Sequence, residues 1–156
     1  MKKVIFTTTL SAIRDCRPCE SGWKKLLAHL GKKKADAEPL NLLTILVSNG
    51  TQDMLWALQA VEHPALEKIA RLMAADFAEA VLPIFEKEYP KDNRPRKAIQ
   101  AARDFANGKI GAAARAAAGA AAWAARAAAW AAAWAAAGDA AGDEQAKIIR
   151  KYLKEK

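Results

Sequence analysis

Apolar residues recur along most of this chain at the three- and four-residue spacing that places them on one face of an α-helix. In one segment, Leu66, Ile69, Met73, Phe77 and Val81 all fall on the same side. No run of alternating apolar and polar residues is long enough to predict a sheet. The pattern therefore predicts an all-α protein of about seven helices.

Prolines, glycines and capping residues predict where these helices begin and end. A helix that is apolar nearly all round is expected over Leu40–Val47, and Asn49-Gly50 should break it. Thr51 and Asp143 have side chains suited to capping the helices that follow them. Pro83 should kink the end of the helix that contains it, because its ring clashes with the preceding turn.

The segment Gly111–Ala141 is the most unusual part of the chain, since 22 of its 31 residues are alanine. Alanine is the best helix former, so one long helix is expected here. Trp123, Trp130 and Trp134 are seven and four residues apart, which places them within roughly 40° of one another around the helix. The segment predicts a rod with alanine faces and a single tryptophan stripe.

These elements predict a single all-α domain over residues 1–156, with the long alanine helix packed centrally. The connections are mostly two to six residues long, which is typical of antiparallel helical neighbours. The tryptophan stripe is interpreted first as core packing between helices. Alanine faces and a flat indole stripe also suit burial in a homo-oligomer, so we expect the protein to self-associate.

Positive charge is concentrated near the N-terminus. Nine of the first 34 residues are Lys or Arg, against Asp15 and Glu20 only, although the whole chain carries +8. We interpret it first as a solvated, solubilising surface, and an anionic partner near the N-terminal segment is the alternative. Nucleic-acid binding is a weaker hypothesis, since no recognised binding motif accompanies the charge.

The sequence lacks the patterns that direct a chain to or across a membrane. The apolar run Val4–Phe6 is too short for a secretory signal. The longest uncharged stretch of the alanine segment, residues 127–138, is shorter than the ~20 residues that a membrane span needs. We therefore expect a cytoplasmic protein without a membrane association.

The residues that could carry chemistry are few and lack the surroundings that a catalytic or metal site requires. Cys16 and Cys19 have the spacing of a redox or metal pair, but no strand–helix–strand unit or second ligand pair accompanies them. His29 and His63 have no obvious partner nearby in the sequence. We expect a protein that is not an enzyme and that holds no metal or cofactor.

Two groups of residues are candidates for binding a ligand or partner. Arg94, Arg96 and Lys97 form a basic cluster at the start of a predicted helix, where free backbone N–H groups also favour anions. Glu86, Glu88 and Asp92 lie nearby and would neutralise that cluster. In the alanine segment, Arg115 and Arg126 flank the stripe of Trp123, Trp130 and Trp134, where an indole could stack on a planar anion.

Four stretches of the sequence carry a resemblance to a known family. They are Cys19–Trp23; Leu40–Gly50 with Leu55–Leu58; Leu82–Pro90 with Asp92–Ile99; and Ala101–Gly108 leading into the alanine segment. With them the chain resembles the Ala/Trp-rich putative immunity proteins, an immunity-protein-like domain of bacterial toxin systems that phages also carry. The third stretch is the most specific.

The resemblance implies a helical protein that binds and neutralises something and that is not a catalyst. The leading hypothesis is stoichiometric binding that blocks a toxin or an immune effector. The alternative is sequestration of an anionic nucleotide immune signal, as in phage counter-defence. In both cases the candidate contacts are the basic cluster and the Arg and Trp side chains of the alanine segment.

Overall fold

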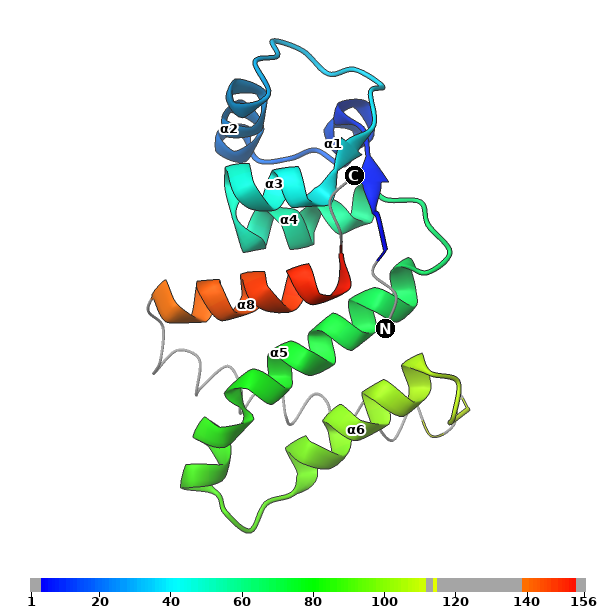
Figure 1. Cartoon of the computed structure of the whole chain (residues 1–156), viewed down its shortest axis with the longest axis vertical. Helices are drawn as coiled ribbons and strands as arrows, with labels where there is room; N and C mark the ends of the chain where they lie inside the picture. The colour runs from blue at the N-terminus through cyan, green and yellow to red at the C-terminus, as the bar shows by residue number, and fades with distance from the viewer. Residues whose placement is uncertain (1–3, 112–113, 115–138, 154–156) are drawn as a thin grey trace. The chain divides into compact units, whose positions relative to one another are not determined.

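Helices dominate the computed structural model (Figure 1), which describes residues 4–111, 114 and 139–153. The all-α class is confirmed for these residues, which hold seven α-helices, one 3-10 turn and a two-stranded sheet. The helices are α1 (Leu10–Asp15), α2 (Glu20–His29), α3 (Leu42–Asn49), α4 (Thr51–Ala57), α5 (Leu66–Glu88), α6 (Arg94–Ala106) and α8 (Asp139–Tyr152). The 3-10 turn η1 is Leu58–Ala60, and the strands are β1 (Thr7–Thr8) and β2 (Leu40–Asn41).

The chain divides into two compact units. Unit 1 comprises residues 1–66 and 149–156, and unit 2 comprises residues 67–148. Unit 2 is thus inserted into unit 1, because the chain leaves unit 1 after residue 66 and returns to it at residue 149. A compact unit is not necessarily an independently folding domain, so the single domain over residues 1–156 stays a prediction.

The short sheet of unit 1 changes the expected start of one helix. Strand β1 pairs antiparallel with β2, and Thr8 lies opposite Leu40. The helix expected from Leu40 therefore begins two residues later, at Leu42, and the side chain of Asn41 caps it by accepting a hydrogen bond from the Leu43 N–H at 2.8 Å. Apolarity alone gave no sign that Leu40 and Asn41 are extended.

The junction between α3 and α4 is made by a glycine rather than by a capping threonine. Gly50 ends α3 and also precedes α4, with a φ of 92° that suits a residue without Cβ. The expected break at Asn49-Gly50 is confirmed. The expected cap at Thr51 is wrong, since Thr51 is the first residue of α4 and no side chain caps this helix.

The core of unit 1 gathers apolar side chains from both ends of its sequence. Val4 pairs in parallel with Leu153, and the Val4 N–H donates to the Tyr152 carbonyl at 2.9 Å. The largest side chains buried in this unit are Phe6, Leu10, Leu42, Ile45, Met54, Ile149 and Leu153. The last described residues of the chain, 149–153, therefore pack into the same core as its N-terminal segment.

In unit 2, α5 and α6 pack against each other through small and branched side chains. Ala75 and Leu82 of α5 and Ile99 of α6 are buried together, with Ala78 and Ala102 packed against them. Pro83 lies within α5, which continues to Glu88, and Figure 1 shows the C-terminal part of this helix turning away from its N-terminal axis.

The C-terminal helix differs from the expectation at its start. Helix α8 begins at Asp139, so Asp143 lies inside it and is not its cap. The long alanine helix and its tryptophan stripe were predicted for residues that, apart from Gly111, Ala114 and the start of α8, lie outside the described part of the chain.

Candidate functional site

Three of the eight predicted binding residues lie together on one described element. Arg94, Arg96 and Lys97 occupy the first turn of α6. The other five, Arg115, Arg126, Trp123, Trp130 and Trp134, lie outside the described residues. The geometry of the candidate site therefore begins with α6 and its neighbour α5.

Ion pairs join α5 and α6 at two levels. Arg96 donates to Glu86 from Nε and Nη2, at 2.9 and 2.8 Å. Two turns further along α6, Arg103 donates from both Nη atoms to Glu79, at 2.9 and 2.5 Å. The two partners are seven residues apart on each helix, as an antiparallel pair requires, so these contacts fix the register of the hairpin.

Arg103 also reaches a second carboxylate, which is buried. Its Nη2 donates to Oδ1 of Asp76 at 2.6 Å, and only 8% of the Asp76 side chain is exposed. Hydrogen bonds to Glu79 first, and then to Asp76, raise the pKa of Arg103 above its usual range. The guanidinium of Arg103 therefore bridges one buried and one half-exposed carboxylate of α5.

The remaining basic residues of the cluster differ in what they contact. Arg94 donates to both oxygens of Asp92, from Nε at 2.9 Å and from Nη2 at 2.6 Å. These hydrogen bonds lower the pKa of Asp92 to about 2. The neutralisation anticipated from the sequence thus holds for Glu86 and Asp92. Lys97 is exposed and makes no ion pair with any described residue.

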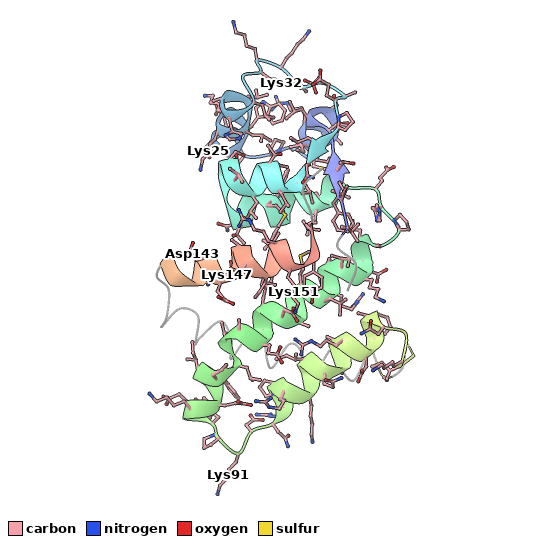
Figure 2. All side chains as sticks on the ribbon, in the orientation of Figure 1. Lys25, Lys32, Lys91, Asp143, Lys147 and Lys151 are labelled. Carbon is pink, nitrogen blue, oxygen red and sulfur yellow. The ribbon has the colours of Figure 1, made fainter. Side chains whose placement is uncertain are left out.

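The turn between α5 and α6 exposes an aromatic residue among lysines. Tyr89 is 59% exposed, and its ring stacks on Phe85 with the ring centroids 4.9 Å apart. A shallow hollow of about 450 Å³ is lined by Tyr89, Pro90, Lys91 and Asp92. Lys91 projects from the turn away from both helices (Figure 2). This tip offers a flat apolar surface with positive charge beside it.

A groove along the hairpin brings together two of the predicted residues and several that the sequence did not single out. It has a volume of about 330 Å³ and is lined by Glu79, Leu82, Arg96, Lys97, Ile99, Gln100 and Arg103. The predicted Arg96 and Lys97 therefore share this groove, whereas Arg94 points to Asp92. Sequence reasoning missed Arg103 and Glu79, although the seven-residue spacing of Arg96 and Arg103 was a usable signal.

The described residues contain neither a metal-binding cluster nor a membrane-spanning helix. No group of three or more His, Cys, Asp or Glu side chains there is arranged to hold a metal ion. Among the same residues, no helix is both long enough and apolar enough to cross a membrane. The side chain of Cys19 instead caps α2, accepting from the Gly22 N–H at 3.4 Å.

Comparison with known proteins identifies the family of the chain. No curated protein and no solved structure matches it. The model of the Imm-5 like putative immunity protein family matches residues 67–146, which nearly coincide with unit 2 at residues 67–148. The resemblance carried by residues 82–99 lies within that match. The chain belongs to the Imm-5 like putative immunity protein family.

Proposed function

We propose that this protein neutralises a toxin, or an immune effector, by stoichiometric binding through the tip and groove of the α5–α6 hairpin. The observation that carries the proposal is the coincidence of the family match with unit 2, because the hairpin is the main described part of that unit. A family named for immunity implies a partner to be blocked. The identity of that partner and the binding surface are the steps that we add.

The hairpin has the properties of a binding surface that is organised before the partner arrives. Its two levels of ion pairs hold α5 and α6 in one register, so little order has to be created on binding. Tyr89 stands exposed at the tip, and tyrosine is among the residues that most often dominate binding energy at interfaces. We therefore assign Tyr89 as the central anchor.

Charge at the tip favours an acidic partner. Between residues 86 and 97 there are five basic and three acidic residues. Arg94 and Arg96 are paired with Asp92 and Glu86, which leaves Lys87, Lys91 and Lys97 as the exposed cations, and we take Lys91 and Lys97, at the turn and at the start of α6, as those that meet a partner. Such exposed charges mainly accelerate and orient association, whereas a buried aromatic anchor sets the dissociation rate.

The sequestration of an anionic nucleotide through Arg115, Arg126 and the tryptophan stripe stays a prediction, since these residues lie outside the described part of the chain. Homo-oligomerisation through the same segment stays a prediction for the same reason.

The test is to co-express the full chain with a toxin domain encoded beside a gene of this family, in bacterial cells whose growth that toxin stops. We expect growth to be rescued, and the activity of the purified toxin to fall linearly to zero at one equivalent. A catalyst that destroys the toxin would act below one equivalent. Tyr89→Ala should weaken binding about 30-fold, which corresponds to about 2 kcal/mol.

A matched pair of variants separates the hairpin from general charge effects. Lys91→Ala with Lys97→Ala should slow association several-fold and reduce its dependence on salt. Lys33→Ala with Lys34→Ala removes the same charge from exposed positions of unit 1 and should change neither. If Tyr89→Ala protects cells as well as the wild type, or if both lysine pairs have equal effects, the hairpin is not the neutralising surface.

A further inference from the structure

Unit 1 contains a cavity that the family match does not cover. It has a volume of about 330 Å³, at the lower end of the range of ligand pockets. Its walls come from α1, the α1–α2 connection, α2, α3 and α4, and its most distinctive residues are Cys19, Gly22, Trp23, Asn49, Asp53 and Trp56. Two of the stretches that carry the family resemblance, Cys19–Trp23 and Leu40–Gly50 with Leu55–Leu58, thus contribute residues to its walls.

Two indoles line this cavity instead of filling the core. Trp23 of α2 is partly exposed, and Trp56 of α4 is 38% exposed. Large aromatic side chains that border an open cavity offer flat faces on which a planar ring can stack. The guanidinium of Arg14 already lies over Trp23, with Cζ 5.5 Å from the ring centroid, and places a positive charge at the rim.

A carboxylate is held in this cavity in a fixed position. Asn49 donates from Nδ2 to Oδ2 of Asp53 and to the Gly22 carbonyl, both at 2.8 Å, so both of its amide hydrogens are used. Its own Oδ1 accepts from the hydroxyl of Ser48 at 2.7 Å. Within the described part of the chain, Asp53 makes no ion pair and its Oδ1 accepts no hydrogen bond.

The missing side chain of Gly22 makes room for this carboxylate. A Cβ at position 22 would lie 2.7 Å from Oδ2 of Asp53 and 3.1 Å from Sγ of Cys19. Real Cβ atoms essentially never come as close as the first of these distances, so any larger residue would push the carboxylate away. Gly22 and Asn49 therefore position Asp53 from two sides.

Indole faces and an acceptor-only carboxylate select one kind of ligand edge. An ionised carboxylate accepts hydrogen bonds and donates none, so it fits a planar group with two neighbouring N–H donors. The Watson–Crick edge of guanine has such a pair, at N1 and at the exocyclic N2. Adenine presents an acceptor next to its amino group, which the carboxylate would repel.

Charge around the cavity distinguishes guanine from a free guanidinium cation, which offers the same donor pair. Arg14 stands over Trp23, and Arg17 directly precedes the lining residue Pro18. Arg17 is also the only non-glycine residue of the described chain with a positive φ, at 56°, a conformation that often marks functional positions. Arg14 is thus placed over a lining ring and Arg17 is next to the lining in the sequence, and these two guanidinium groups would attract a phosphate and disfavour a cation.

We propose that the cavity of unit 1 binds a guanine nucleotide, with the base against Trp23 and Trp56, its N1–H and N2–H donated to Asp53, and its phosphate at Arg14 and Arg17. The site lies in unit 1 and takes a small molecule, so it goes beyond the toxin binding proposed for the hairpin of unit 2.

The test is isothermal titration of the full chain with GMP, AMP, guanosine and agmatine, the last as a probe for a guanidinium cation. We expect GMP to bind at least tenfold more tightly than AMP and severalfold more tightly than guanosine, with an affinity that falls as salt rises. Tighter binding of AMP or of agmatine than of GMP, or no binding of GMP at millimolar concentration, overturns the proposal.

Two variants with the same change of charge locate the site. Asp53→Asn should lose at least tenfold in affinity for GMP, because the amide presents a donor to the N–H edge of the base, while Asp143→Asn, at an exposed position of unit 2, should bind as the wild type does. Arg14→Ala should bring the affinity for GMP close to that for guanosine. Equal losses in Asp53→Asn and Asp143→Asn would refute the assignment of Asp53.

The comparison of GMP with AMP on the unaltered protein needs no variant, so it stays decisive even if Asp53→Asn fails to fold. The two proposals also fail separately. Lys91→Ala with Lys97→Ala should retain full affinity for GMP, and Asp53→Asn should still neutralise the toxin. Loss of GMP binding in the lysine variant would show that the ligand sits elsewhere.

Discussion

The ion pairs of Arg103 allow a direct test of how burial changes the value of a charge pair. One guanidinium donates to Asp76, whose side chain is 8% exposed, and to Glu79, whose side chain is 50% exposed. The perturbation is Arg103→Met, which keeps much of the aliphatic stem and removes the charge. Combining it with Asp76→Asn and, separately, with Glu79→Gln gives two double-mutant cycles that share one arm.

The expected magnitudes follow from the exposure of each partner. Breaking a fully buried pair by removing one partner costs about 3–5 kcal/mol, whereas an exposed pair contributes about 0.2–1 kcal/mol. Arg103 itself is 24% exposed, so its pair with Asp76 falls between these limits. We expect Arg103→Met to lower the free energy of unfolding by about 2 kcal/mol, with a coupling of about 1.5 kcal/mol to Asp76 and about 0.5 kcal/mol to Glu79.

The assays are urea denaturation and thermal denaturation of the wild type and of the five variants at low and high salt. For a chain of this length, a loss of about 2 kcal/mol should lower Tm by about 4–8 °C. Salt should reduce the coupling to Glu79 and leave that to Asp76 nearly unchanged, because solvent ions screen exposed pairs more effectively. The raised pKa of Arg103 owes more to Glu79 than to Asp76, which is the opposite of the order expected from burial. A coupling to Glu79 equal to or larger than that to Asp76 would refute the argument from burial.

Three further changes test individual contacts. Arg94 lowers the pKa of Asp92 to about 2, so the stability from this pair is present above about pH 4 and is lost as the pH falls through 2. In Arg94→Gln, carboxyl NMR should show the titration midpoint of Asp92 rising toward 3.8. Gly50→Ala should cost about 1 kcal/mol or more, because φ is 92° there, and an unchanged denaturation midpoint would contradict this. Gly22→Ala should destabilise the wild type, because its Cβ would meet the Asp53 carboxylate, but it should stabilise Asp53→Ala by up to about 1 kcal/mol through helix propensity. A change in unfolding free energy of the same sign in both backgrounds would disprove the close approach.

Local sequence patterns were sufficient to predict most of the described helices. The apolar spacing of Ile69, Met73 and their neighbours predicted α5, and Ile69 and Met73 are indeed buried. The break at Asn49-Gly50 followed from residue type alone. The errors occurred where long-range pairing decides local structure, as at Leu40, which the β1–β2 sheet holds in an extended conformation that its own sequence does not specify.

The role of the basic cluster could be predicted only in part. Neutralisation by Glu86 and Asp92 was foreseeable, because these acids lie ten and two residues from Arg96 and Arg94 along the chain. The pairing of Arg103 with Asp76 and Glu79 spans 27 and 24 residues, and it depends on the register of two antiparallel helices. The packing between the two helices includes Ala78 and Ala102, which no periodicity rule distinguishes from any other alanine.

The cavity of unit 1 was beyond sequence reasoning for a different physical reason. Trp23 and Trp56 occur at helical spacings that also suit core positions, and an aromatic residue at such a spacing usually packs inside. In the structure both line a cavity, beside Asp53, which comes close to α2 where residue 22 has no side chain. A glycine inside a helix costs stability, so helix propensity does not explain Gly22. The room that it leaves for the Asp53 carboxylate does. The hairpin in unit 2 and the carboxylate in unit 1 therefore rest on separate sets of contacts, and each can be altered without the other.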